Sequence, residues 1–218
     1  MNRFYPVFLD IEGKRAVVIG GGPVAQRKAA SLIEAGAAVT VISPEAVPAI
    51  ARLAERGILT HKPRKYRKGD LRGAVVVIAA TDDPSVNERV ASEAKALGIL
   101  INCATPPDSG NFIVPSSIKK GALTLAISTG GASPALSKRL RLDLEVFLGT
   151  RYSWFLEFLE EARGRLKAEV EDEAARQEIL RKLVDHCLSG EFVVMPDNEA
   201  LKKTGLMLES ILTAFRSR

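Results

Sequence analysis

The chain has 218 residues, and its 46% of hydrophobic residues is enough for the core of one large or two modest domains. No apolar run approaches the roughly 20 residues of a membrane-spanning helix, and residues 1–12 lack the apolar centre of a secretory signal. The net charge of +5 permits a nucleic acid, an acidic surface or a polyanionic small molecule as partner, and selects none of them.

Cysteine and histidine are scarce. Cys103 and Cys187 are the only cysteines in the sequence, so we expect no disulfide framework. We expect a reducing, cytoplasmic location instead. Cys187 adjoins a lone His186, and no clustered partner gives the two the spacing of metal ligands. The sequence therefore predicts no metal site.

A glycine-rich turn follows the first apolar run. Residues 16–19 lead into three glycines and then into a helical pattern that opens with Pro23, a residue suited to the first helical position. Gly20, Gly22 and Ala25 fit the Gly-x-Gly-x-x-Gly/Ala fingerprint, in which a helix N-terminus receives the pyrophosphate of a dinucleotide. The turn predicts a dinucleotide site at Gly20, Gly21 and Gly22.

The alternation of strand and helix patterns continues to about residue 102. A continuous apolar run at 74–80 is typical of a central parallel strand, and an inward stripe that includes Leu97 marks the helix after it. The expected strands are 16–19, 39–42, 58–60, 74–80 and 99–102, and the expected helices begin at Pro23, Ala46 and Pro84. This order predicts an α/β fold with an N-terminal Rossmann-type parallel sheet.

Two later turns hold further candidate cofactor contacts. Thr81 and Asp82 follow the central strand, whose carboxyl end borders the ligand crevice of such sheets, whereas Asp83 is expected only to cap a helix. Ser43, Pro44 and Glu45 follow the second strand. An acid there binds the ribose hydroxyls of NAD, but Glu45 comes late and could instead cap the next helix. The residues alone leave NAD and NADP open.

A basic run occupies residues 61–68. It contains five Lys or Arg residues around Tyr66 and is interrupted by Pro63, so it offers no helix that could enter a nucleic-acid groove. It has two interpretations, a patch for phosphates or carboxylates and a solvated loop, and the solvated loop is favoured. His61 is given no role.

The pattern changes after the fifth strand. A long turn at 103–110 precedes an alternating strand at 122–128 and a helix that Ser133 caps and Pro134 opens. Two strands and one apolar-faced helix are too few to close a core, so we expect this segment to pair with another subunit. From residue 151 the remainder is helical by pattern.

In the order of its motifs the chain resembles the precorrin-2 dehydrogenase family, the dehydrogenase and ferrochelatase module of sirohaem synthesis. The likeness covers roughly the first 150 residues. It rests on Tyr5-Pro6-Val7-Phe8, on residues 18–28, on Ala79-Ala80-Thr81-Asp82-Asp83 with Asn87, on Asn111-Phe112-Ile113-Val114-Pro115, and on residues 128–134.

The resemblance implies NAD-dependent oxidation of precorrin-2, a tetrapyrrole, to sirohydrochlorin, with insertion of ferrous iron as a second step. It implies a homodimer built from a Rossmann domain (1–112), a small α+β dimerisation segment (113–150) and an all-helical C-terminal domain (151–218). Family contacts to NAD would fall on Pro23 and Val24 and on Pro44 and Glu45, with no part for nucleic acid or a membrane.

One departure from the family concerns the turn after the fifth strand. The family usually carries an aspartate there, proposed as the general base and chelatase residue, where this chain has Thr105. A threonine hydroxyl does not ionise near neutral pH and cannot accept a proton as a carboxylate would. Asp108, on the same loop, is the substitute candidate, and iron insertion is the step that the departure calls into question.

The helix after residue 133 carries three basic residues, which could attract and orient the many carboxylates of precorrin-2. The alternative, given equal weight, is that these residues only form a solvent-exposed helix face. The predicted substrate contacts are Asn102, Ser128, Thr129, Lys138, Arg139 and Arg141.

Two alternative functions are also compatible with the sequence. The first is a regulatory module that senses a dinucleotide without catalysis, for which the missing aspartate is the motive. The second, motivated by the basic run alone, is a nucleic-acid binder, which would show salt-sensitive binding to duplex DNA.

Overall fold

The computed structural model describes residues 4–149, 151–188, 205–206, 208–210 and 213. The chain divides into a first unit that ends at Val114 and a second that begins at Pro115. This boundary lies two residues beyond the predicted end of the Rossmann domain, and the further division at residue 150 stays a prediction.

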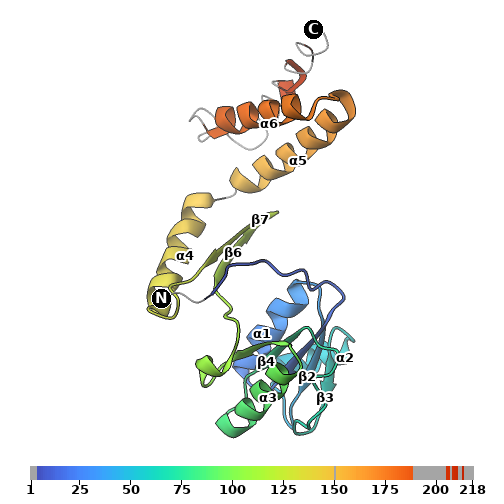
Figure 1. Cartoon of the computed structure of the whole chain (residues 1–218), viewed down its shortest axis with the longest axis vertical. Helices are drawn as coiled ribbons and strands as arrows, with labels where there is room; N and C mark the ends of the chain where they lie inside the picture. The colour runs from blue at the N-terminus through green and yellow to red at the C-terminus, as the bar shows by residue number, and fades with distance from the viewer. Residues whose placement is uncertain (1–3, 150, 189–204, 207, 211–212, 214–218) are drawn as a thin grey trace. The chain divides into compact units, whose positions relative to one another are not determined.

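The first unit is built on a five-stranded, fully parallel sheet, seen in Figure 1. The strand order is β3-β2-β1-β4-β5. In the register, Val18 lies between Val41 of one neighbouring strand and Ile78 of the other. The strands are β1 (Arg15–Ile19), β2 (Ala38–Ile42), β3 (Thr60–Lys62), β4 (Val76–Ala79) and β5 (Leu100–Cys103).

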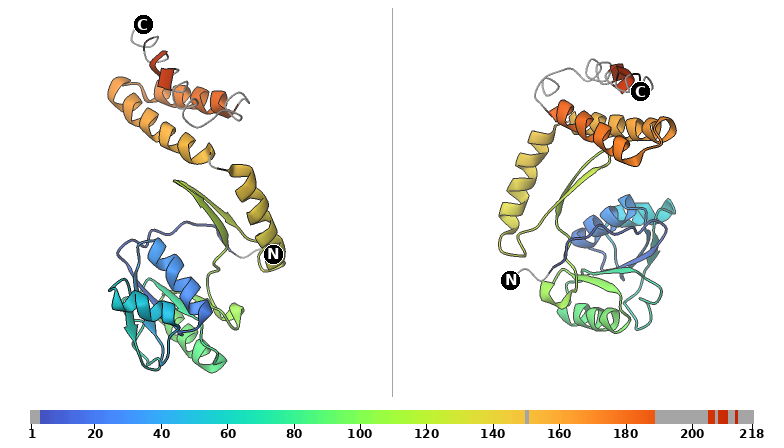
Figure 2. Two further views of the ribbon diagram at one scale, coloured as in Figure 1. Left: turned by 180° about the vertical axis from the view of Figure 1, so that it is seen from behind. Right: turned by 45° about the horizontal axis from the view of Figure 1, so that its top comes forward.

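Helices cover both faces of this sheet, as Figures 1 and 2 show. Ala16 and Val18 of β1 share a core cluster with residues of α1 (Pro23–Glu34) and α2 (Pro48–Glu55). Val17 and Ile19 share another with residues of α3 (Pro84–Ala96). Because successive strand residues point to opposite faces, a sheet buried on both sides needs the continuous apolar runs seen in the sequence.

Two expected details are wrong. The third strand begins at Thr60 rather than 58, because the amides of Gly57 and Ile58 donate to Ala54 and Leu53 to end α2. Leu97 is 47% exposed instead of facing inward, since α3 ends at Ala96 and Leu97 is its C-terminal cap.

In the second unit, the elements whose bounds the structure describes are a two-stranded antiparallel sheet and three helices. These elements are β6 (Ser116–Lys120), β7 (Leu123–Ile127), α4 (Pro134–Leu148), α5 (Arg151–Glu169) and α6 (Glu173–Leu188). α4 contacts both strands, and α5 packs on α6 around Phe158, Leu166 and Leu183. Among the described helices none is both long and apolar enough to cross a membrane.

Candidate functional site

The strand order creates a switch point beside β1. From β1 the chain proceeds to β2 and β3 on one side, and β4 and β5 extend the sheet on the other. In open parallel sheets a crevice forms at such a point, outside the carboxyl ends of the strands. The loops after β1, β2, β4 and β5 all leave from that edge, and they carry the predicted cofactor residues except Pro23 and Val24, which are the first two residues of α1.

The glycine loop after β1 is fixed by close backbone contacts. Gly20 has φ 125°, and a Cβ added there would lie 2.3 Å from the carbonyl oxygen of Ala80 at the end of β4. A Cβ added at Gly21 would lie 1.9 Å from the carbonyl oxygen of Glu45. At Gly22, by contrast, an added Cβ would meet no described atom within 4 Å. Two glycines thus serve packing inside the protein, and the third faces open space.

The N-terminus of α1 is left without a side-chain cap. Gly22 is its N-cap and Pro23 its first residue, and no described side chain accepts from the amides of the first turn. Of the other Pro-initiated helices, α2 likewise lacks a described side-chain cap, whereas Asp83 accepts from Ser85 at the start of α3 and Ser133 accepts from Leu136 at the start of α4. Uncapped amides at the positive end of a helix dipole fit an anionic group, and the pyrophosphate of a dinucleotide meets this requirement.

The loop after β2 packs against the glycine loop. The amide of Val47 donates to the carbonyl of Gly21 at 2.8 Å. The N-cap of α2 is Val47 and carries no side-chain cap bond, so the interpretation of Glu45 as a helix cap is wrong. Glu45 and Pro44 are exposed beside the glycines, where the adenosine ribose lies in a Rossmann site.

His61 has a role that the sequence did not suggest. Its Nε2 lies 3.1 Å from the carbonyl oxygen of Ser43 and 3.2 Å from the Ser43 hydroxyl. Because a carbonyl only accepts, Nε2 carries the proton and donates to it. His61, from β3, thereby anchors the buried Ser43 at the base of the loop after β2. The contact joins residues far apart in the chain, so no local pattern reveals it.

The loop after β4 is organised by Asn87 of α3, which is fully buried. Its Oδ1 accepts from the amide and the hydroxyl of Thr81, and its Nδ2 donates to the carbonyls of Thr81 and Thr105. Asp82 is exposed at the same edge, and Asp83 caps α3 as expected. Asn87 belongs to a motif of the family resemblance, but no local pattern identifies it as the link between two loops.

The loop after β5 folds back on its strand. The amide of Asn111 donates to the carbonyl of Ile101 at 2.9 Å, and a 3-10 turn, η1 (Pro107–Ser109), carries the exposed Asp108. The side chain of Asn102 donates to the carbonyl of Phe112 at 3.1 Å. Thr105 and Asp108, the two candidate catalytic residues, therefore share one loop at the carboxyl edge of the sheet.

The other predicted substrate residues belong to the second unit. The Thr129 hydroxyl donates to the carbonyl of Ser133 and accepts from its amide, so it stabilises the start of α4. The Ser128 hydroxyl accepts from Gly130. On α4, Lys138 is exposed, and two arginines pair with carboxylates one turn on. Those pairs are Arg139 with Asp143 and Arg141 with Glu145.

Possible metal ligands and thiols are few in the described part of the chain. No three His, Cys, Asp or Glu side chains come together there as metal ligands would, and the side chains of His186 and Cys187 lie outside it. Burial raises the pKa of the Cys103 thiol, which holds it in its protonated, unreactive form.

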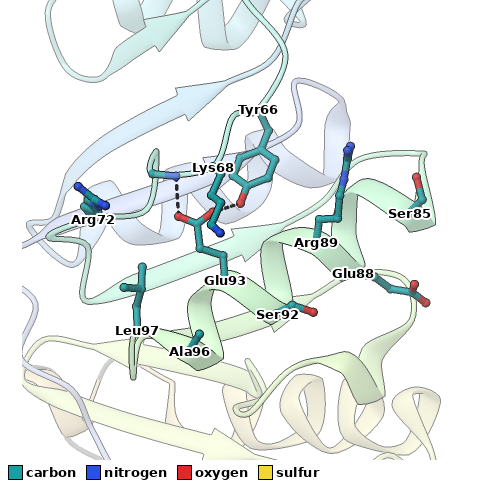
Figure 3. Close-up of a pocket in the computed structure, with 11 residues that line it drawn as sticks. Tyr66, Lys68, Arg72, Ser85, Glu88, Arg89, Ser92, Glu93, Ala96 and Leu97 are labelled. Atoms are coloured by element: carbon teal, nitrogen blue, oxygen red, sulfur yellow. Dashed lines mark hydrogen bonds between the residues drawn. The ribbon is translucent and has the colours of Figure 1, made fainter.

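Side-chain hydrogen bonds hold part of the basic run in place, and Figure 3 shows the one that Tyr66 makes. Arg64 forms a two-pronged ion pair with Asp70, and the Tyr66 hydroxyl donates to Glu93 of α3, which also accepts from the amide of Gly69. An open groove of about 970 Å³ runs along this face of α3. Lys65, Arg67 and Lys68 are exposed, in agreement with the favoured interpretation as a solvated loop.

Comparison with known proteins agrees with this architecture. A family model described as "Putative NAD(P)-binding" matches residues 7–116, and one described as "Sirohaem biosynthesis protein central" matches residues 120–146. A solved structure, "SirC, precorrin-2 dehydrogenase", is similar with a TM-score of 0.75 and 31% identity, over 93% of this chain and 99% of that chain.

Two curated relatives are named siroheme synthase. That of Chromobacterium violaceum is 37% identical over 197 residues, which are 90% of this chain and 42% of the relative. That of Nitrosococcus oceani is 35% identical over 198 residues, 91% of this chain and 42% of the relative. The chain thus spans less than half the length of these relatives. With its NAD(P)-binding domain as the first unit, the chain belongs to the family of the precorrin-2 dehydrogenases and siroheme synthases.

Proposed function

We propose that the protein oxidises precorrin-2 to sirohydrochlorin with NAD as the hydride acceptor. The observation that carries this proposal is the uncapped start of α1 beside Gly22, at the switch point of the sheet. The likeness to SirC, which extends over 99% of that chain, supports the choice of substrate.

The oxidation removes two electrons and two protons from precorrin-2, and the bound nicotinamide supplies the hydride acceptor while one proton is released. Thr105 is suited to hydrogen bonding with the tetrapyrrole and not to accepting that proton. Asp108 is the carboxylate on the same loop and takes the role of base in this proposal. Lys138, Arg139 and Arg141 offer positive charge to the carboxylates of the substrate.

The choice of NAD over NADP rests on Glu45. Its carboxylate is exposed on the loop whose backbone contacts Gly21. A carboxylate there accepts hydrogen bonds from the ribose hydroxyls of NAD and repels the 2′-phosphate of NADP. Ser43, Thr81 and Asp82 complete the proposed cofactor contacts.

We further propose a cytoplasmic homodimer whose partner covers the apolar side of the segment 113–150. Leu136 and Leu140, one turn apart on the same face of α4, are 49% and 39% exposed. Large apolar side chains grouped on one element are typical of a surface that a partner buries.

The experiment is an anaerobic incubation of the purified full chain with precorrin-2 and NAD. We expect the sirohydrochlorin spectrum to grow together with NADH absorbance in equal amounts. Saturable NAD binding without product would reject the enzyme and favour the regulatory module that senses the dinucleotide, for which Thr105 is the supporting observation. Equal rates with NADP would refute the role given to Glu45.

A further inference from the structure

Asn87 is a polar side chain buried where two functional loops meet. It is 0% exposed, and its amide makes four hydrogen bonds. Its Nδ2 donates at 2.9 Å to each of the Thr81 and Thr105 carbonyls, and its Oδ1 accepts from the Thr81 amide at 3.1 Å and the Thr81 hydroxyl at 2.8 Å.

The position of these bonds matters more than their number. The parallel ladder between β4 and β5 continues only to the bond from the Ala104 amide to the Ala79 carbonyl, at 2.8 Å. Beyond it, the loops with Thr81 and Thr105 leave the sheet, and Asn87 joins their backbones. One of these loops is assigned to the cofactor and the other to the substrate.

General stability alone does not explain which groups Asn87 binds. An apolar side chain of similar size would fill the space but would leave the backbone groups of Thr81 and Thr105 without these bonds. The acceptors and donors that Asn87 binds belong to the two loops and not to neighbouring turns of α3. The arrangement therefore favours a geometric role over a packing role.

We propose that Asn87 is a positioning residue that sets the separation of the cofactor loop and the substrate loop. The proposal rests on the proposed function, because hydride transfer requires the donor carbon and the nicotinamide to be held about 3–3.5 Å apart. In this proposal Asn87 touches neither the cofactor nor the substrate, and it acts through the backbones of Thr81 and Thr105.

The test compares Asn87→Asp, Asn87→Ala and a matched control, Asn111→Asp, in the full chain. Asn87→Asp retains the acceptor and loses both donors, and its carboxylate faces two carbonyl oxygens. Asn87→Ala removes the link without adding charge and serves if the first variant folds poorly. Asn111 makes the same kinds of bond, with the Ile101 amide and the Ile99 carbonyl, but both lie at one strand.

Turnover and nucleotide affinity should separate in the Asn87 variants. We expect kcat to fall by about 10–100-fold, while the Kd for NAD changes little because the glycine loop is intact. Without any ligand, hydrogen exchange should quicken at residues 104–109. In Asn111→Asp, kcat and the exchange of residues 104–106 should stay near those of the parent.

A kcat within about twofold of the parent and unchanged exchange in both Asn87 variants would overturn the inference. So would equal losses in Asn87→Ala and Asn111→Asp, which would indicate general destabilisation. If the parent forms no sirohydrochlorin, the proposed function fails, and hydrogen exchange alone decides whether Asn87 couples the two loops.

Discussion

Gly20 and Gly22 lie two residues apart but have different surroundings. An added Cβ at Gly20 meets the Ala80 carbonyl at 2.3 Å with φ at 125°, whereas at Gly22 it meets no described atom within 4 Å and φ is −83°. Gly20→Ala should therefore cost at least about 2 kcal/mol of unfolding free energy. Gly22→Ala should cost about 1 kcal/mol or less and weaken NAD binding, because its methyl group occupies the approach of the pyrophosphate.

Urea unfolding and NAD titration of the two variants check this pair. If Gly20→Ala is as stable as the parent, the close approach to β4 is unimportant. If Gly22→Ala binds NAD as tightly as the parent, the open space beside the loop is not the pyrophosphate site.

Thr105 makes iron insertion testable at a single residue. When a metal ion enters the tetrapyrrole, the ring nitrogens lose protons. A carboxylate at this position can accept these protons, and a threonine hydroxyl cannot. We expect Thr105→Asp to insert ferrous iron into sirohydrochlorin faster than the parent, as followed anaerobically by the sirohaem spectrum. Brisk insertion by the parent that Asp108→Ala does not reduce would contradict this account of the loop.

The residue scale also shows where sequence reasoning stops. The tight turn at Gly20 could be predicted, because it follows from the backbone freedom of one residue within a short motif, whereas the pyrophosphate contact at Gly22 stays a prediction. The roles of Asn87 and His61 could not be predicted, since their partners Thr105 and Ser43 reach them only through the tertiary fold. Side-chain bonds between distant loops leave no local pattern in a sequence.

Among the elements, the connection between β3 and β4 contains a half-buried ion pair. Asp70 accepts two hydrogen bonds from Arg64, and the side chain of Asp70 is only 9% exposed. The Arg64 hydrogen bond is the main cause that lowers the pKa of Asp70 in the folded protein. A carboxyl whose pKa is lowered by folding stabilises the fold above its unfolded pKa of about 3.9. That contribution is lost as the pH falls through the folded value.

Asp70→Asn should accordingly lower the urea midpoint at neutral pH, and the difference from the parent should fade in acid, below about pH 4. Asp143→Asn is the matched control, because its pair with Arg139 is 53% and 75% exposed and should contribute little. A difference between Asp70→Asn and the parent that is the same at neutral and acid pH would show that charge is not its cause.

The helix α4 carries the test of the dimer. Leu136→Glu places a charge on the proposed interface, so we expect the dimer Kd to rise at least about tenfold in sedimentation equilibrium. Leu97→Glu makes the same kind of change on an exposed apolar residue of the first unit and should leave the dimer intact. A parent that is monomeric at all concentrations, or an unaffected Leu136→Glu, would refute the proposed interface.

Over the whole molecule, the Rossmann unit could be predicted because alternating strands and helices leave few topologies once crossovers are right-handed. The starts of α3 and α4 were also predicted, since Asp83 and Ser133 precede prolines. The start of β3 was not, because it depends on which amides end α2. An apolar face such as that of α4 predicts that something covers it, and the pattern does not identify the partner.

The account as a whole depends on a dinucleotide bound where α1 begins, and calorimetric titration of the full chain measures this directly. We predict saturable heat with one NAD per chain, weaker binding of NADP, and reduced affinity in Gly22→Ala. The absence of saturable heat with both nucleotides, in oxidised and reduced forms, would contradict the account.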